Sequence, residues 1–245
     1  IAYAEARAVY RRAAALANLD VVGIDCHIGS QLTDLTPLLD ALDRLLLLVD
    51  QLAEDGITLH HLDIGGGVGI RYRDETPPDL NRYAQAVREK LADRKLKVLM
   101  EPGRSLVGNA GVLLTRVEYL KLGETKHFAI VDAAMNDLMR PSLYDAWHDI
   151  VPVSQTDGPA QLVDVVGPVC ESSDFLGKDR QLAVEEGALL AVLSAGAYGS
   201  TMSSNYNTRA RAAEVLVENG QPRLIRERDS FAQMVANELN LLEPR

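Results

Sequence analysis

Glycines that could hold a phosphate follow an apolar run early in the chain. The run GGGVG at 65–69 comes directly after LHHLDI at 59–64. Glycines that follow a strand leave backbone N–H groups exposed, and such groups bind anions. Ile70 stands where the third glycine of the dinucleotide-binding GxGxxG motif would be, so that motif is not matched. A tight turn that needs positive φ explains the glycines equally well, and both interpretations remain open here.

Two further motifs place reactive groups directly after apolar runs. CHIGSQ contains His27 and Ser30, although an isolated histidine is more often structural than a ligand. EPGR contains Glu101, Gly103 and Arg104, which place a carboxylate and a guanidinium on one turn. A surface ion pair is the alternative, but the proline and glycine between the charges favour a fixed turn with close backbone approach.

The second half of the chain contains a pair of residues suited to binding a carboxylate. Arg140 and Tyr144 are four residues apart in MRPSLYDAWHD. On a helix they would share a face, where a guanidinium and a phenol could bind one carboxylate together. The alternative is a helix packed by its aromatic side chains, and the motif alone favours that alternative.

A cysteine and a tyrosine complete the candidates. Cys170 precedes Glu171 in CESSD, and the neighbouring carboxylate is expected to disfavour the thiolate. A neutral thiol suits a proton donor, although a lone cysteine is more commonly a small core residue. Tyr198 lies between small residues in GAYGSTMSSNYN, a segment too polar for a core.

The composition excludes several classes of function. The formal net charge is −10, from 35 Asp and Glu against 25 Lys and Arg, which argues against nucleic-acid or anionic-membrane partners. The two cysteines, Cys26 and Cys170, exclude a disulfide framework and indicate a reducing cytoplasm. We expect no metal site, because no cysteine pair has zinc-ligand spacing and the adjacent His60 and His61 would face opposite sides of a strand.

The elements that position these motifs differ between the two halves. In the first half, predicted helices cover 2–18, 35–53 and 79–93, and predicted strands cover 21–28, 59–64 and 97–100. This alternation predicts parallel strands whose C-terminal ends carry the motifs, although three strand–helix units are too few to close a barrel. In the second half, predicted strands cover 112–122, 127–133, 161–168, 189–197 and 212–220, before a final helix over 229–240. We therefore predict an α/β domain over 1–111 and a mainly antiparallel β domain over 112–245.

Taken in order, the motifs resemble the diaminopimelate decarboxylase family. The resemblance rests on HIGSQ, LDIGGGVGI, EPGR, NDLMRPSLY, GPVCESSD and GAYGSTMSSNYN, and it is most specific at CESSD and MSSNYN. It implies the C-terminal part of a TIM-type (β/α)8 barrel that binds pyridoxal 5′-phosphate (PLP), followed by the β domain. It also implies decarboxylation of meso-diaminopimelate to L-lysine, the last step of lysine biosynthesis. The implied partner is a second copy, in a homodimer with active sites shared across the interface.

The resemblance implies a role for each candidate residue. The implied cofactor contacts are His27, Ser30, Gly66, Gly67, Glu101, Gly103, Arg104 and Tyr198. The implied substrate contacts are Arg104, Arg140, Tyr144, Glu171 and Tyr198. His27 would stack on the pyridine ring and Glu101 would pair with its nitrogen, so that the ring accepts electrons. The implied catalytic residues are His27 and Cys170. Cys170 would donate a proton to the carbon that loses CO2.

One residue that the family needs has no counterpart in this chain. In the family, the lysine that forms a Schiff base with the cofactor lies ahead of the region that this chain resembles. The lysines of this chain have no such context: Lys90, Lys95, Lys97, Lys121, Lys126 and Lys178. We therefore expect the C-terminal two-thirds of a longer enzyme, inactive by itself.

Two alternatives remain open. A related decarboxylase acting on ornithine or arginine would share the architecture but typically has HVGSG in place of HIGSQ. The three carboxylate-binding residues are Arg104, Arg140 and Tyr144. They suit diaminopimelate, which has a second carboxylate, better than ornithine or arginine, which have one carboxylate and a cationic tail. A catalytically inactive homologue that regulates an active relative is also possible, although such a protein would have no need of Cys170 and Glu171.

Overall fold

The structure, a computed structural model, describes residues 1–154 and 158–242. The chain divides into two compact units, Ile1–Leu106 and Val107–Arg245. The division lies between residues 106 and 107, a few residues before the boundary expected between 111 and 112. The predicted fold class is confirmed, because an α/β unit is followed by a mainly antiparallel β unit.

A three-stranded parallel sheet forms the centre of unit 1. Its order is β1-β2-β3, with strands Gly23–Asp25, His61–Asp63 and Lys97–Leu99. Each strand is shorter than predicted, because the residues after it turn into loops at the C-terminal edge of the sheet. The turn after β2 starts at Asp63, whose carboxylate accepts a hydrogen bond of 2.8 Å from the backbone N–H of Gly65.

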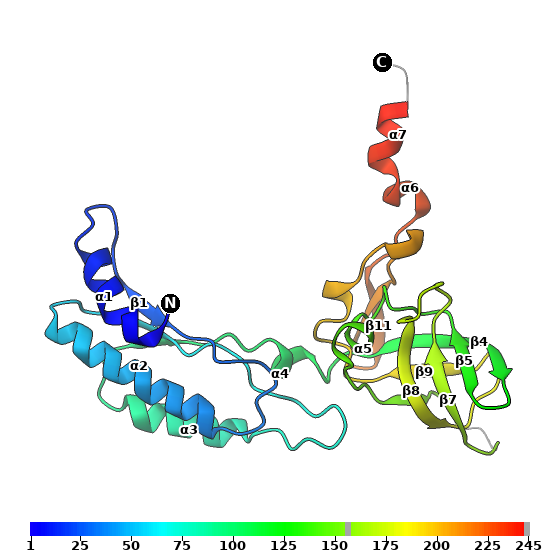
Figure 1. Cartoon of the computed structure of the whole chain (residues 1–245), viewed down its shortest axis with the longest axis horizontal. Helices are drawn as coiled ribbons and strands as arrows, with labels where there is room; N and C mark the ends of the chain where they lie inside the picture. Colours follow the sequence, from blue (N-terminus) through cyan, green and yellow to red (C-terminus); the bar gives the residue numbers. More distant parts are fainter. Residues whose placement is uncertain (155–157, 243–245) are drawn as a thin grey trace. The chain divides into compact units, whose positions relative to one another are not determined.

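Three helices accompany this sheet (Figure 1): α1 (Tyr3–Ala14), α2 (Thr36–Glu54) and α3 (Leu80–Leu91). Pro37 occupies the first turn of α2, as predicted, where no N–H is needed. The leucines of α2 recur at helical spacing, and the buried face comprises Leu38, Leu42, Leu45, Leu46, Leu48, Val49 and Leu52. Asp79 caps α3 by accepting a hydrogen bond of 2.8 Å from the backbone N–H of Asn81.

Unit 2 contains a six-stranded sheet in the order β6-β9-β4-β5-β7-β8. In chain order its strands are β4 (Leu113–Leu122), β5 (His127–Val131), β6 (Ile150–Pro152), β7 (Gln161–Val166), β8 (Phe175–Leu182) and β9 (Leu189–Val192). The pair β5–β7 is parallel and the other neighbours are antiparallel. A hairpin of β10 (Glu214–Glu218) and β11 (Gln221–Arg226) forms a separate two-stranded sheet.

Short helices punctuate the two units and close the chain. They are α4 (Arg104–Val107), α5 (Arg140–Tyr144), η1 (Ser200–Met202) and η2 (Tyr206–Thr208). The final helix predicted over 229–240 is divided at Val235 into α6 (Phe231–Met234) and α7 (Ala236–Leu242), which extend away from the sheet of unit 2 (Figure 1). None of the helices in the described ranges combines the length and apolar composition needed to cross a bilayer.

Candidate functional site

The glycine loop after β2 lies between the loops that follow β1 and β3. A Cβ on Gly66 would lie 2.2 Å from the carbonyl oxygen of Glu101, and one on Gly67 would lie 2.2 Å from that of Gly29. Gly67 also has φ +89°, which disfavours any other residue. The turn therefore needs glycine at these positions, and the phosphate site stays a prediction.

Gln31, the last residue of HIGSQ, fastens the first loop to the glycine loop. Its side-chain amide donates to the carbonyl of Ile70 at 2.6 Å and accepts from the N–H of Ile70 at 3.1 Å. Leu32 adds two backbone hydrogen bonds of 2.9 Å, one with Gly67 and one with Gly69. Sequence reasoning used HIGSQ as a family marker and did not foresee that its glutamine holds two loops in register.

Arg104 connects the EPGR turn to the other two loops of unit 1. Its guanidinium donates to the hydroxyl of Ser30 at 3.0 Å and to the hydroxyl of Tyr72 at 2.5 Å. Tyr72 is buried, and the guanidinium carbon lies 5.6 Å from the centre of its ring. The structure thus brings together two predicted residues, Arg104 and Ser30, and adds Tyr72, which sequence reasoning missed.

Three carboxylates gather at the C-terminal edge of the sheet. Asp25, Asp63 and Glu101 end or follow the three strands, and their nearest oxygens all lie within 4.8 Å of one another. Burial raises the pKa of the neighbouring Cys26 thiol, and the charges of Asp25 and Asp63 raise it further. The edge is therefore strongly negative and favours a positively charged group beside Glu101.

The other predicted residues of unit 1 lie in the same loops. His27 is exposed, and a Cβ on Gly65 would lie 3.4 Å from its Cα atom. Gly103 differs from expectation, because nothing in the described part of the chain lies within 4 Å of the position of an added Cβ. The space beside Gly103 is therefore open, and the close backbone approach expected there stays a prediction. Lys97 begins β3 and so lies at the opposite edge of the sheet from this cluster.

In unit 2, the segment at residues 135–136 connects the motifs that the sequence singled out. The buried carboxylate of Asp174 accepts hydrogen bonds of 2.7 Å from the N–H groups of Met135 and Val169. Burial raises the pKa of Asp174, and these N–H groups oppose the shift. The hydroxyl of Ser142 donates to the carbonyl of Ser173. The RPSLY and CESSD motifs are therefore held together by the side-chain hydroxyl of Ser142 and the backbone of Ser173.

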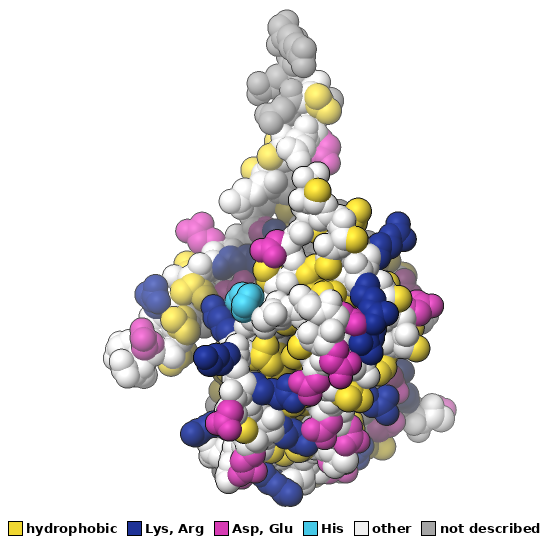
Figure 2. All heavy atoms as spheres, turned by 90° about the vertical axis from the view of Figure 1, so that its left-hand side faces the viewer, with side chains coloured by type: hydrophobic (Ala, Val, Ile, Leu, Met, Phe, Trp, Pro, Cys, Tyr) yellow, Lys and Arg dark blue, Asp and Glu magenta, His cyan; other side chains and the backbone are white. Residues whose placement is uncertain are grey.

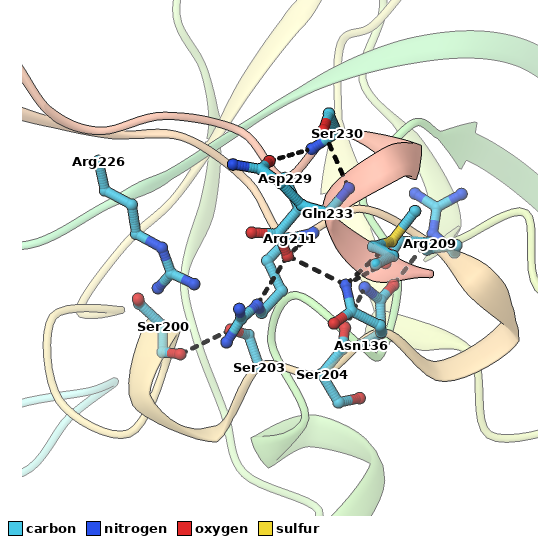
Figure 3. Close-up of polar contacts among 12 residues, drawn as sticks. Asn136, Ser200, Ser203, Ser204, Arg209, Arg211, Arg226, Asp229, Ser230 and Gln233 are labelled. Atoms are coloured by element: carbon cyan, nitrogen blue, oxygen red, sulfur yellow. Dashed lines mark hydrogen bonds and ion pairs between the residues drawn. The ribbon is translucent and has the colours of Figure 1, made fainter. Parts of the chain in front are cut away.

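A second set of contacts holds the SSNYN segment against the same point (Figure 3). Asn136 is fully buried. Its side-chain amide donates a hydrogen bond of 3.0 Å to the carbonyl of Ser204, and its side-chain oxygen accepts one of 3.0 Å from the Nε of Arg209. Asp229 accepts from Arg211 at 2.8 Å, and this hydrogen bond, followed by one from Asn205, lowers the pKa of Asp229 to about 2. These contacts fix the SSNYN segment to Asn136 and to Asp229.

Arg140 and Tyr144 share helix α5 but have different surroundings. Arg140 is 8% exposed, and its Nη1 lies 2.7 Å from Nε2 of His148. Tyr144 is 62% exposed. The structure therefore places both residues on the predicted helix, and a joint grip on one carboxylate stays a prediction.

Cys170 and Glu171 lie on the exposed turn that Asp174 anchors. The carboxylate of Glu171 accepts from the N–H of Ser172 at 3.0 Å and from the hydroxyl of Tyr206 at 3.5 Å. Tyr198 is 42% exposed and has φ +58°, a conformation that costs a non-glycine residue about 1–3 kcal/mol. Strain at an exposed tyrosine is typical of functional positions, which agrees with its place in the predicted site.

Acidic and basic side chains are interspersed across the face shown in Figure 2, and neither sign covers it. Within unit 1, ion pairs join two helices. Lys90 lies 2.7 Å from Asp43, and Arg94 lies 2.5 Å from Asp50, so α3 is paired with α2 at two points.

Comparisons with known proteins match both units. The family model described as "Pyridoxal-dependent decarboxylase, pyridoxal binding domain" matches residues 1–108. The chain is 61% identical over 242 residues to a diaminopimelate decarboxylase of Neisseria meningitidis, covering 99% of this chain and 60% of that protein. It is 62% identical over 238 residues to the diaminopimelate decarboxylase of Pseudomonas aeruginosa, covering 97% of this chain and 57% of that protein.

A solved structure shows the same arrangement. The crystal structure of diaminopimelate decarboxylase from Helicobacter pylori complexed with L-lysine matches with a TM-score of 0.91 and 40% sequence identity. The match covers 98% of this chain and 60% of that one. The chain thus spans about three fifths of the length of the relatives it matches.

Proposed function

We propose that this chain is part of a pyridoxal-dependent decarboxylase, and that the complete protein converts meso-2,6-diaminopimelate to L-lysine and CO2. The relatives that are about 60% identical to this chain are named for that substrate. Since the chain spans about three fifths of their length, the activity is proposed for the complete protein and not for these 245 residues alone.

The observation that carries the proposal is the glycine loop packed between two strand-end loops, at positions where only glycine fits. Side chains are excluded at Gly66 and Gly67, while the Ser30 hydroxyl and the Arg104 guanidinium lie in the adjoining loops. Exposed backbone, a hydroxyl and a cation together fit the phosphate of PLP. These residues, with the EPGR turn, would hold that phosphate.

The same edge of the sheet suits the ring of the cofactor. Glu101 would accept a hydrogen bond from the protonated pyridine nitrogen, and the nearby carboxylates of Asp25 and Asp63 favour that positive charge. His27 would stack on the ring and Tyr198 would contact it. When bound, PLP accepts the electron pair that remains on the α-carbon as CO2 leaves.

The remaining residues act on the substrate. Arg104, Arg140 and Tyr144 would bind a carboxylate, which positions the molecule and disfavours substrates that lack the second carboxylate of diaminopimelate. Glu171 would bind the distal ammonium group. Cys170 would donate its proton to the carbon that has lost CO2, which completes L-lysine.

We further propose that two copies assemble and that Cys170 and Glu171 serve the site of the second copy. Both residues lie on an exposed turn, where a second chain could reach them. The cytoplasm is the proposed location, in agreement with the free thiols of Cys26 and Cys170.

The test is an assay of the complete protein, loaded with PLP, on three substrates. We expect release of CO2 and L-lysine from meso-diaminopimelate, with kcat/KM at least about 100-fold above that for L-ornithine or L-arginine, because the buried guanidinium of Arg140 would lose its carboxylate partner. Preference for ornithine or arginine would identify the related decarboxylases instead. A protein that binds PLP, is inactive on all three substrates and alters the activity of a relative would be the regulatory homologue.

A further inference from the structure

The backbone after α5 returns to its own first residue. Asp145 adopts a left-handed conformation, φ +51° and ψ +33°, and ends the helix. Ala146 then donates a backbone hydrogen bond of 3.4 Å to the carbonyl of Arg140. The turn brings the side chain of His148, eight residues after Arg140, to the guanidinium.

His148 has donor and acceptor roles that its neighbours determine. Its Nδ1 lies 2.9 Å from the carbonyl oxygen of Leu193, which can only accept. Its Nε2 lies 2.7 Å from Nη1 of Arg140, which can only donate. The ring therefore carries its proton on Nδ1 and offers the lone pair of Nε2 to Arg140.

His148 connects Arg140 to the sheet of unit 2. His148 is 0% exposed, so its ring is fixed on all sides. Leu193 directly follows β9, and its N–H donates to the carbonyl of Asp149 at 2.8 Å. The chain of contacts thus runs from β9 through His148 to the first residue of α5.

We propose that His148 is a positioning residue that orients Arg140 to bind the substrate carboxylate that is not lost in the reaction. The inference rests on the proposed function and deepens it. CO2 leaves from the reacting carbon, so the carboxylate used for recognition is the one that the product L-lysine keeps. The contact between Nη1 and His148 fixes the rotation of the planar guanidinium, and a bidentate contact with a carboxylate requires a fixed orientation.

Ligand binding by the complete, PLP-loaded protein tests this role. The probes are L-lysine and cadaverine, which is L-lysine without its carboxylate. In His148→Leu we expect the Kd for L-lysine to rise about tenfold, as for the loss of one hydrogen bond to a charged group, and the Kd for cadaverine to change by less than about twofold. His148→Gln, whose amide can still accept from Arg140, should restore most of the affinity for L-lysine.

Equal weakening of both ligands would overturn the inference, because a merely structural histidine would affect the whole site. Unchanged binding of L-lysine in folded His148→Leu would overturn it too. If that variant does not fold, ¹⁵N NMR of histidine-labelled wild-type protein decides. A neutral ring protonated at Nδ1 supports the assignment, and an imidazolium, which cannot accept from Arg140, contradicts it. A wild-type protein that decarboxylates none of the three substrates would instead remove the proposed function, independently of His148.

Discussion

Cys170 can be tested separately from the turn that carries it. The turn is held by the buried carboxylate of Asp174, which accepts from the backbone N–H groups of Met135 and Val169. The anchors that flank the CESS segment are the N–H of Val169 and the carboxylate of Asp174, and the exposed thiol is not one of them. Removing the thiol should therefore leave the turn in place.

We expect Cys170→Ala in the complete protein to retain PLP and to lose turnover by about 10²–10⁴-fold, the usual contribution of a positioned general acid. Cofactor absorbance measures the first effect and steady-state kinetics the second. Ser172→Ala, in the same exposed turn, is the matched control and should retain nearly full activity. Loss of PLP from Cys170→Ala would assign the thiol a role in cofactor binding instead.

A mixing experiment tests whether Cys170 serves the second copy. The Cys170→Ala protein is combined with a variant that lacks the cofactor-binding lysine of the complete chain. If sites are shared, some mixed dimers contain one intact site, and activity should return. If mixed dimers form and remain inactive, Cys170 acts within its own chain.

Arg104 should be poorly replaced by lysine. Its guanidinium donates to both Ser30 and Tyr72, and a single ammonium cannot reproduce that fork. We expect Arg104→Lys to lower kcat/KM for diaminopimelate by about 10- to 100-fold, equivalent to about 1.4–2.7 kcal/mol of transition-state stabilisation. Arg82→Lys, on the exposed face of α3, is the control and should change little. An unaltered kcat/KM in Arg104→Lys would remove Arg104 from the substrate contacts.

Among the elements of unit 1, α1 is held to the end of α2 by a charged cluster. Arg7 and Arg11, one helical turn apart, both donate to the carboxylate of Asp55. These hydrogen bonds, with Arg7 the larger contributor, hold the pKa of Asp55 well below its usual range. A carboxyl whose folded-state pKa is depressed contributes stability above its unfolded pKa of about 4, and that contribution is lost as the pH falls further.

We therefore expect Asp55→Asn to loosen α1 at pH 7 and to reduce the acid sensitivity of its attachment between about pH 4 and pH 2. Hydrogen exchange of the α1 amides, followed across that pH range, measures both effects. Asp40→Asn removes the same charge from an exposed position of α2 and should leave α1 protection unchanged. Equal exchange in wild-type protein and Asp55→Asn at pH 7 would show that apolar contacts alone attach the helix.

The same elements show what a single sequence predicts well. The long helices α2 and α3 were located to within about two residues, because their apolar positions recur over several turns. Strands β6 and β8 were missed, since β6 has three residues and β8 carries Gly177 among charged residues. Strand β11 was missed although Asn219-Gly220 before it, both with positive φ, is a strong hairpin signal.

Across the whole molecule, the motifs were easier to predict than the contacts that support them. His27, Ser30 and Arg104 stand out because of residue type and a position after a strand. Gln31 and His148 do not stand out in the sequence, because their partners are distant. Gln31 binds Ile70, 39 residues away, and His148 binds Leu193, 45 residues away. Such supporting contacts depend on how distant segments meet, which periodicity and local motifs do not encode.

The last prediction concerns a polypeptide limited to these 245 residues. In the described part of unit 1, the sheet order β1-β2-β3 leaves β1 and β3 as edge strands, and parallel sheets are normally covered and extended on both sides. Apolar side chains near those edges are exposed, including Val22 at 43% and Met100 at 48%. We expect this polypeptide to bind the dye ANS, to form aggregates in sedimentation experiments and to unfold without one sharp transition, whereas the complete protein should unfold sharply. A monomeric preparation of the 245 residues with a single sharp transition would contradict the argument, because the open edges would then cost the fold little.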